Sequence, residues 1–346
     1  MRKTFFSVIM PCYNSEAFLT DALDSVVNQT YNNWELIIIN DGSFDKTLEI
    51  ANSYALKDKR IRIFTKENGG YATAVNMGLD FVKGDYFLFL GSDDYISTEL
   101  FEKIHKEIEK IGFLPDMIAF RTRLIKKGVI REIENSTNFD TVLLSKCQIK
   151  EFIETKPKYA SIFSTRDTSR CYKSDLLGET RYFGTTGMDA DGIFSMLISH
   201  KASSFFNIPI DGYYWRLRGD SVSATTSLTK TIDRISNWYK FFSIISEFKT
   251  TEITSTEKSY LKYYCAFVIK LANHPQNVLK YRKTIIKNAK LIKCTAVKLN
   301  VQMPNELNCV AKAPLLFSLK SYLHRFIKKK YSNLIEILTK FFKTSL

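Results

Sequence analysis

The stretch SVIMPCYNSEAFLTDALDSVVNQTYNNWELIIINDGSFDKT, residues 7–47, contains two short apolar runs on either side of a helical pattern. Residues 7–10 predict a buried strand that stops at Pro11, because proline cannot continue a central strand. Residues 16–28 predict a helix, and residues 34–39 predict a second buried strand. Strands that are almost wholly apolar indicate a parallel sheet covered on both faces.

The same alternation continues toward the C-terminus. Two further strands are predicted at residues 61–65 and 85–90, and two further helices at residues 47–54 and 71–82. Alternating strands and helices are typical of an α/β fold with a doubly covered, mostly parallel sheet.

Polar residues and glycines follow each of the four predicted strands. In chain order the four clusters are Pro11-Cys12-Tyr13-Asn14, Asn40-Asp41-Gly42-Ser43, Asn68-Gly69-Gly70 and Ser92-Asp93-Asp94. Ligands of open parallel sheets bind outside the carboxyl ends of the strands. Any one cluster is compatible with a simple turn, but four at the same edge predict a binding site.

The later part of the chain is harder to assign. A helix is expected at residues 98–111, a hairpin at 117–133, a helix at 192–199 and a strand at 202–215. After about residue 227 the pattern becomes helical. We therefore expect an α/β domain at residues 1–228, with an N-terminal half at about 1–95 and a C-terminal half at about 96–228. A basic helical region is expected at residues 229–346.

The positive charge is concentrated at the C-terminal end. The chain has a formal net charge of +14, and residues 231–346 hold 21 Lys and Arg against 6 Asp and Glu. From residue 314 onward, leucines, isoleucines and phenylalanines recur every three or four residues between lysines, which predicts a basic amphipathic helix. Such a helix suits an anionic membrane surface. The alternative is packing against the catalytic domain or another subunit, as in a homo-oligomer. No motif of a nucleic-acid-binding fold is present.

The cysteines and the N-terminus bear on the cellular compartment. The six cysteines are scattered without metal-ligand spacing, which indicates free thiols and no zinc site. The apolar run near the N-terminus is too short for a signal peptide, and no window reaches the ~18 apolar residues of a membrane span. We expect a cytoplasmic protein, or one that lies peripherally on the inner face of the cell membrane.

Adjacent carboxylates at the end of the fourth strand predict a metal site. Asp93 and Asp94 repel each other, and a divalent cation would neutralise them. Mg²⁺ and Mn²⁺ prefer oxygen ligands and often retain phosphate oxygens in their shell. The alternative is a helix N-cap with a solvated neighbour.

The other clusters are less specific. Asp41 can accept a hydrogen bond from the N–H of a base, although Asp-Gly is also a common turn. Asn68, Gly69 and Gly70 allow close backbone approach to a ribose or phosphate before a helix N-terminus.

Two pairs of charged residues lie further along the chain. Asp189 and Asp191 precede a predicted helix, and either is suitable as a general base or as a helix cap. Arg216 and Arg218 are suitable for clamping a diphosphate, or they lie at a solvated strand end.

Taken together, these residues resemble the family 2 glycosyltransferases, which are inverting enzymes of the GT-A fold. The resemblance covers about residues 5–225. It rests on the quoted stretch and on NGGYATAVNMGL, GDYFLFLGSDD, ADGIF and YYWRLRGDSVS. It implies a metal-dependent hexosyl- or N-acetylhexosaminyltransferase that uses a UDP-sugar or a similar nucleotide-diphosphate donor. The implied acceptor is a glycan or a polyprenyl-linked glycan in bacterial surface polysaccharide biosynthesis.

The resemblance also implies that residues 1–228 are a catalytic domain, with a nucleotide-sugar half at about 1–95 and an acceptor half at about 96–228, and it implies residue roles. Asp41 would contact the base, Asp94 would hold the metal ion on the diphosphate, and Asp93 would lie near the ribose or sugar. Asp191 would be the base, with Asp189 as its competitor. Pro11, Tyr13 and Glu16 would line the base pocket.

Four positions depart from the family pattern. Gly91 and Asn40 replace acids, Val75 stands where many members carry arginine, and Ala190 replaces the Glu before Asp191. These departures motivate one rival hypothesis, a non-catalytic glycan-binding or scaffold protein. A second rival, a nucleotidyltransferase, usually has a glycine-rich basic loop near the N-terminus. Residues 10–20 contain no Gly, Lys or Arg.

Overall fold

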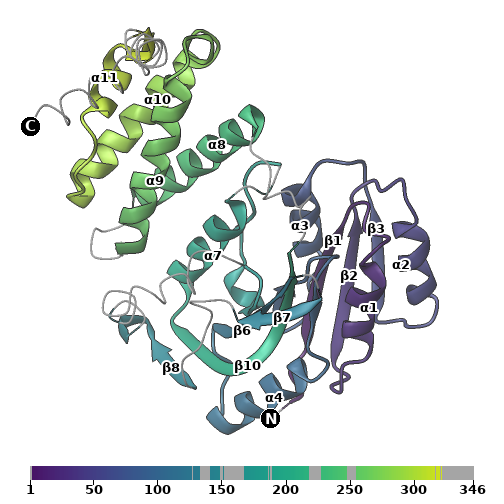
Figure 1. Ribbon diagram of the computed structural model, residues 1–346. Coiled ribbons are helices and arrows are strands. Elements are labelled where there is room, and N and C mark those ends of the chain that lie inside the picture. The colour runs from purple at the N-terminus through teal and green to yellow at the C-terminus, as the bar shows by residue number, and fades with distance from the viewer. Residues whose placement is uncertain are drawn as a thin grey trace, which may run out of the picture. The chain divides into compact units, whose positions relative to one another are not determined.

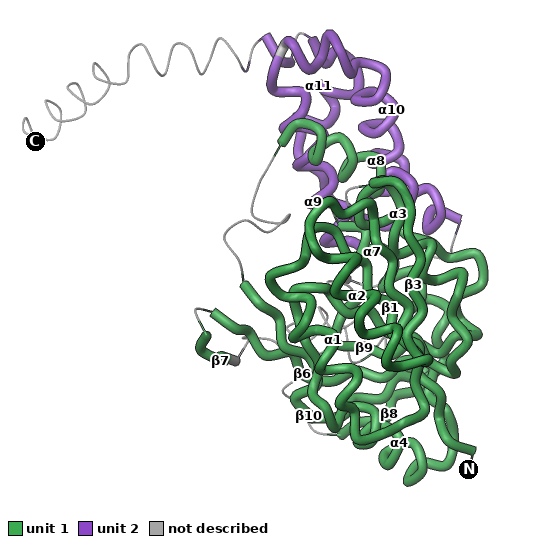
Figure 2. The backbone as a smooth tube through the Cα atoms, turned by 90° about the vertical axis from the view of Figure 1, so that its right-hand side faces the viewer, with its two compact units in different colours: residues 1–237 green, residues 238–346 purple. Residues whose placement is uncertain are grey.

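The computed structural model describes residues 2–126, 128–132, 141–148, 151, 167–185, 187, 189–217, 227–247, 255–315, 317–319 and 321. The chain forms two compact units, residues 1–237 and residues 238–346, which Figure 2 shows in different colours. The division falls inside helix α8 (Leu228–Ile245).

The first unit is built on one sheet (Figure 1), in the order β3-β2-β1-β4-β9-β6-β10-β5, with β7 and β8 attached to β6 and β10. Its strands are β1 (Phe6–Cys12), β2 (Trp34–Asn40), β3 (Ile61–Thr65), β4 (Tyr86–Phe89), β5 (Tyr95–Ile96), β6 (Met117–Lys126), β7 (Val129–Glu132), β8 (Val142–Ser145), β9 (Arg170–Lys173) and β10 (Ser204–Arg216). The strands β1 to β4 pair in parallel. The expected α/β architecture is therefore confirmed.

The sheet becomes mixed beyond β4. The strand β9 lies antiparallel between β4 and β6, and β5, β7 and β8 also pair antiparallel with their neighbours. The pair β6 and β10 is parallel. The parallel arrangement thus belongs mainly to the half of the sheet that carries the predicted strand-end clusters.

Strand β1 does not stop at Pro11, contrary to the sequence prediction. It continues to Cys12, and Pro11 pairs in register with Ile39 of β2. The backbone of Cys12 faces β2, because its carbonyl accepts a hydrogen bond from Asp41 N at 2.9 Å. Since backbone groups alternate along a strand, those of Pro11 face the β4 side, where the paired residues of β1 end at Ile9. A missing N–H costs little there.

Helices cover both faces of the sheet. The helices α1 (Leu19–Val27), α2 (Thr47–Ala55) and α4 (Leu100–Ile111) pack on one apolar core, and α3 (Tyr71–Leu79) and α7 (Ala190–Lys201) pack on the other. Strand residues alternate between these cores: Val8 and Met10 face the first, and Ile9 faces the second. This burial on both faces explains why the strands are apolar at nearly every position.

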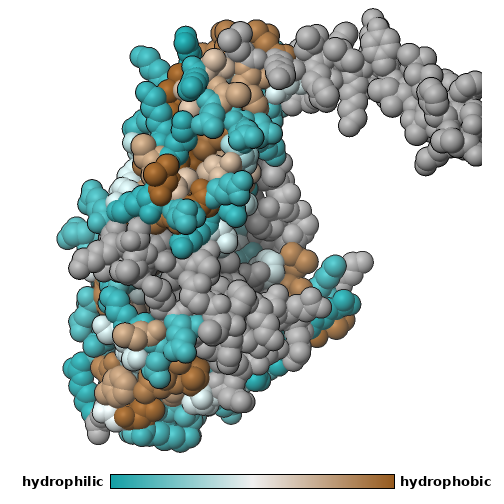
Figure 3. Space-filling model, turned by 90° about the vertical axis from the view of Figure 1, so that its left-hand side faces the viewer, coloured by the Kyte–Doolittle hydropathy of each residue, from teal (hydrophilic) through white to brown (hydrophobic). Residues whose placement is uncertain are grey.

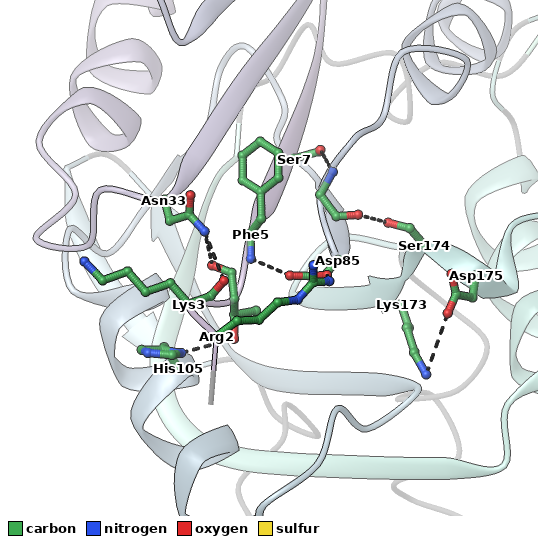
Figure 4. Close-up of polar contacts among 12 residues, drawn as sticks. Arg2, Lys3, Phe5, Ser7, Asn33, Asp85, His105, Lys173, Ser174 and Asp175 are labelled. Atoms are coloured by element: carbon green, nitrogen blue, oxygen red, sulfur yellow. Dashed lines mark hydrogen bonds and ion pairs between the residues drawn. The ribbon is translucent and has the colours of Figure 1, made fainter.

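The amino ends of the strands are held by a separate polar network (Figure 4). The carboxylate of Asp85 accepts a hydrogen bond from Phe5 N at 2.8 Å and pairs with Arg2. His105 lies beside Thr4, with 3.1 Å between its Nδ1 and the threonine Oγ1. These groups lie at the edge opposite the strand-end clusters, so His105 has a structural role.

The second unit is helical. It contains α9 (Ser255–Ala272), α10 (Pro275–Leu299) and α11 (Glu306–Lys312), and α10 packs against both of the others. Trp238 is buried and stacks on Tyr260 with 4.9 Å between ring centroids. Most of residues 314–346, where the basic amphipathic helix is predicted, lie outside the described residues.

On the face shown in Figure 3, the described surface is largely hydrophilic, with smaller apolar patches. All six cysteines are free, as expected. Within the described ranges, no helix combines the length and apolar composition needed to cross a bilayer.

Candidate active site at the carboxyl edge of the sheet

The parallel strands β1 to β4 end at one edge, so the four polar clusters come together as predicted. The loops there are linked directly. The hydroxyls of Ser15, after β1, and Ser92, after β4, lie 2.6 Å apart. Thr47 Oγ1, after β2, accepts a hydrogen bond from Ser15 N at 2.7 Å. The relative positions of the strand-end residues are therefore fixed by side-chain hydrogen bonds.

Asp94 is a buried carboxylate at this edge. It is 6% exposed, and strand β10 supplies both of its hydrogen-bond donors. Tyr213 OH donates to Oδ2 at 2.6 Å, and Arg216 N donates to Oδ1 at 2.8 Å. Burial, followed by the charge of Asp93, raises the pKa of Asp94 to about 7. A bound divalent cation would offset both effects and lower the pKa of Asp94.

The residues present fit a Mg²⁺ or Mn²⁺ ion. A Cβ added at Gly91 would meet Asp94 Oδ2 at 2.9 Å and Asp93 Oδ1 at 3.0 Å, so both carboxylates face the same backbone turn. Among the described residues, no group of three or more His, Cys, Asp and Glu side chains could hold a metal ion. Two carboxylates are what Mg²⁺ commonly takes from a protein when substrate phosphates and water complete its shell.

Tyr213→Phe is expected to raise the pKa of Asp94 further. The substitution removes a hydrogen bond to the ionised carboxylate, and such bonds contribute about 1.5–3 kcal/mol, or roughly 1–2 pH units. Carbon-13 NMR titration of the metal-free protein measures this shift. Tyr214→Phe, which alters a ring stacked on Tyr95 at 4.7 Å, is the matched control. An Asp94 pKa that is unchanged in Tyr213→Phe would contradict the assigned hydrogen bond.

Asp41 organises the loop after β3. Its carboxylate is buried, and Oδ1 accepts hydrogen bonds from Lys66 Nζ at 2.7 Å and Gly69 N at 2.9 Å. Oδ2 accepts one from Gly70 N at 2.9 Å. The two glycine N–H groups therefore point to Asp41, and Oδ2 retains acceptor capacity for a further donor such as a base N–H.

Gly70 allows this loop to approach the segment before α7. Its φ is +88°, and an added Cβ would meet the Thr185 carbonyl oxygen at 2.4 Å. Ala72 N donates a hydrogen bond to the same carbonyl at 3.2 Å. Contact between the donor half and the α7 segment thus requires a glycine at this position.

Gly70→Ala is expected to lower the free energy of unfolding by about 2–3 kcal/mol, because a strained φ and a backbone clash act together. Urea unfolding measures the loss. Gly112→Ala is the matched control, since Gly112 has a φ of +79° and nothing within 4 Å of an added Cβ. Equal losses in the two variants would show that the contact with Thr185 contributes nothing.

Tyr71, the first residue of α3, connects the strand-end carboxylates with those near α7. Burial raises the pKa of its phenol well above the ordinary value. The nearby negative charges that raise it further belong to Asp167, Asp191, Asp94 and Asp93. A Cβ added at Gly187 would meet the Tyr71 ring at 2.7 Å. The phenol of Tyr71 therefore lies within electrostatic reach of both Asp191 and the predicted metal ligands.

The two candidate bases differ in their surroundings. Asp189 has a left-handed φ of 59° and pairs with Arg234 at 3.2 Å. Asp191 lies in the first turn of α7 and contributes to raising the pKa of Asp167. A neighbouring guanidinium stabilises the ionised form and lowers basicity. Asp189 therefore takes part in an ion pair at the start of α7, and which of the two acids acts as the base stays a prediction.

Asp167 is an acid that the sequence interpretation did not identify. It is 2% exposed, and its Oδ2 has no hydrogen-bond partner within the described part of the chain. Burial, followed by the charge of Asp191, raises its pKa to about 8. The adjacent residues 152–166 lie outside the described residues.

The remaining predicted residues are placed as follows. The Arg216 guanidinium pairs with Asp21 of α1 at 2.8 Å, and its positive charge also acts to lower the pKa of Asp94. Arg218 lies outside the described residues. Glu16 Oε2 accepts a hydrogen bond from Lys46 N at 2.9 Å before α2. Tyr13 is 48% exposed at the end of β1, next to the buried Pro11 strand segment.

Other residues of the site had little or no sequence signal. Lys66 follows β3 immediately, and a cation at a strand end could have identified it. Tyr213 lies 119 residues from Asp94, and no local pattern connects them. Tyr71 and Asp167 likewise interact with residues that are distant in the sequence, so no local pattern identifies them.

Comparisons with known proteins find a family model that matches part of the chain and solved structures with a similar fold. Residues 7–170 match the family model described as Glycosyl transferase family 2. The computed structure is similar to S. aureus TarS 1-349 in complex with UDP-GlcNAc, with a TM-score of 0.65 and 18% identity. The match covers 95% of this chain and 92% of that one. At this identity the likeness establishes the fold, a GT-A fold with a helical C-terminal region.

Curated relatives match over shorter stretches. An uncharacterized glycosyltransferase of Haemophilus influenzae is 48% identical over 104 residues, covering 30% of this chain and 42% of the relative. The minor teichoic acid biosynthesis protein GgaB of Bacillus subtilis is 27% identical over 267 residues, covering 76% of this chain and 28% of the relative. The chain thus spans less than half the length of these relatives.

Proposed function

Because residues 7–170 of this chain belong to glycosyl transferase family 2, we propose that the protein transfers a sugar from a nucleoside-diphosphate donor to an acceptor hydroxyl. One observation carries the proposal. The negative charges of Asp93 and Asp94, at the end of β4, and of Asp191, on α7, all act on the phenol of Tyr71. Groups suited to the donor diphosphate and to the acceptor proton thus lie in one site.

The donor is proposed to be a UDP-sugar. Asp41 would accept a hydrogen bond from the base through Oδ2, while its other contacts keep the Lys66–Gly70 loop in place. Tyr13 and Pro11 would lie beside the base. The TarS neighbour has been solved with UDP and with UDP-GlcNAc, which supports this choice of nucleotide.

Asp94, with Asp93, would hold Mg²⁺ or Mn²⁺. When bound, the ion would neutralise the charge that develops on the leaving diphosphate. Such a partner would offset the burial and mutual repulsion that disfavour joint ionisation of the two carboxylates.

Asp191 is proposed as the general base. It would take the proton from the acceptor hydroxyl while that oxygen forms a bond to the anomeric carbon. The bond from the anomeric carbon to the donor phosphate oxygen would break, and the nucleoside diphosphate would leave with the bonding electrons. Attack from the side opposite the leaving group inverts the anomeric configuration.

The acceptor is proposed to be a glycan or a lipid-linked glycan of a bacterial surface polysaccharide. The similarity to GgaB, a minor teichoic acid biosynthesis protein, supports this class. The acceptor would bind beside Asp191.

The alternative is a glycan-binding or scaffold protein that has lost catalysis, for which Gly91 and Ala190 are the motivating departures. Calorimetry with UDP and a panel of nucleotide sugars, with and without Mn²⁺, tests the proposed function. We expect metal-dependent binding of UDP and of one donor sugar. Absence of binding by every nucleotide would favour the non-catalytic alternative.

A further inference from the structure

The helix α10 carries a strongly basic exposed face in the second unit. The helix contains six lysines, one arginine and no acidic residue. Its backbone departs from helical geometry at Tyr281, so the regular part begins at Arg282. The first twelve residues of that regular part, 282–293, carry five cations: Arg282, Lys283, Lys287, Lys290 and Lys293.

These cations share one side of the helix. The spacing of three and four residues from Lys283 through Lys287 to Lys290 keeps their side chains in one row, and all three are exposed. Arg282 and Lys293 lie beside this row and widen the basic face of the helix. The opposite side of the helix is buried against α9 and α11, through residues such as Ile285, Ile292 and Ala296.

Apolar side chains are exposed along the same row. Val297, seven residues after Lys290, is 83% exposed. Leu279, before the irregular residue, is 72% exposed. Leu279 and Val297 thus lie near the two ends of the row of cations. Cations with apolar side chains at both ends form a surface that is suited to lipid headgroups and the acyl boundary below them.

We propose that the exposed face of α10 binds the anionic headgroups of a membrane surface. A soluble polyanion would also attract the lysines, but it would leave Leu279 and Val297 exposed to water. An anionic bilayer satisfies both features, because headgroup phosphates pair with the cations and the apolar side chains enter the interface. This inference is independent of the proposed function.

The test is co-sedimentation of the full chain with vesicles of phosphatidylcholine alone or with 30% phosphatidylglycerol (roughly the composition at which surface charge governs binding). The variant is K283Q/K287Q/K290Q. The matched control is K103Q/K106Q/K110Q, which removes the same charge from three exposed lysines of α4. Circular dichroism verifies that both variants are folded.

We expect the wild type and the control to bind the anionic vesicles, and the binding to weaken with salt. The α10 variant should bind on the order of 100-fold more weakly, since each lysine contributes about fivefold near an anionic surface. Equal binding by the α10 variant would overturn the proposal, and so would failure of the wild type to bind. Binding to immobilised dextran sulfate, but not to vesicles, would overturn it in favour of a soluble polyanion.

Discussion

Asp191→Asn is expected to lower the rate of sugar transfer by about 10³-fold and to leave the dissociation constant of the donor nearly unchanged. A positioned general base contributes about 10²–10⁴-fold to a proton transfer. The amide keeps the size of the side chain but cannot accept the proton. Donor affinity should persist because Asp191 lies on α7, whereas the residues proposed to hold the base and the diphosphate follow strands β1 to β4.

Asp189→Asn is the matched control, two residues away at the start of the same helix. Asp189 pairs with Arg234 at 3.2 Å, so its loss should affect folding stability more than turnover. Initial rates and donor binding should be measured for both variants. Near-normal turnover in Asp191→Asn, combined with a large loss in Asp189→Asn, would assign the base to Asp189.

Asp94→Asn is expected to reduce metal-dependent donor binding by at least about 10²-fold and to abolish turnover. The substitution removes a carboxylate from the proposed metal site, and the loss of even an indirect partner of a metal site costs about 10–100-fold. The side-chain size is retained, and Arg216 N can still donate to the amide oxygen. Binding of Mn²⁺ can be followed by electron paramagnetic resonance of the free ion, and UDP binding by calorimetry.

Asp175→Asn is a suitable control for Asp94→Asn, because the Asp175 side chain is 86% exposed and lies outside the site. It should bind Mn²⁺ and UDP as the wild type does. If Asp94→Asn also bound both with unchanged affinity, the metal assignment would be wrong.

The donor half of the site could be predicted from the sequence because successive strand ends along the chain meet at one edge of the sheet. Apolar strands in a βαβ arrangement must be parallel, and ligands bind where such strands end. Asp41 and the Asp93-Asp94 pair therefore had to lie near one another. The hydrogen bonds from Gly69 N and Gly70 N to Asp41 follow from the same convergence of strand ends.

The acceptor half could not be predicted in the same way. Strand β9 enters between β4 and β6 from a distant part of the sequence, and an antiparallel insertion leaves no periodic signal. The contact of Tyr213 with Asp94 depends on the register of β10, which contains shifts between Asn207 and Tyr213. The direction of the Arg216 guanidinium toward Asp21 depends on packing across the sheet edge. These are tertiary contacts without a local pattern.

Metal-dependent sugar transfer is tested most directly by measuring nucleotide release from a panel of nucleotide sugars, with Mn²⁺ or Mg²⁺ and a range of glycan acceptors. We expect metal-dependent release from one donor by the wild type, and none by Asp94→Asn. Release that is equal with and without metal, or equal in the two proteins, would contradict this expectation.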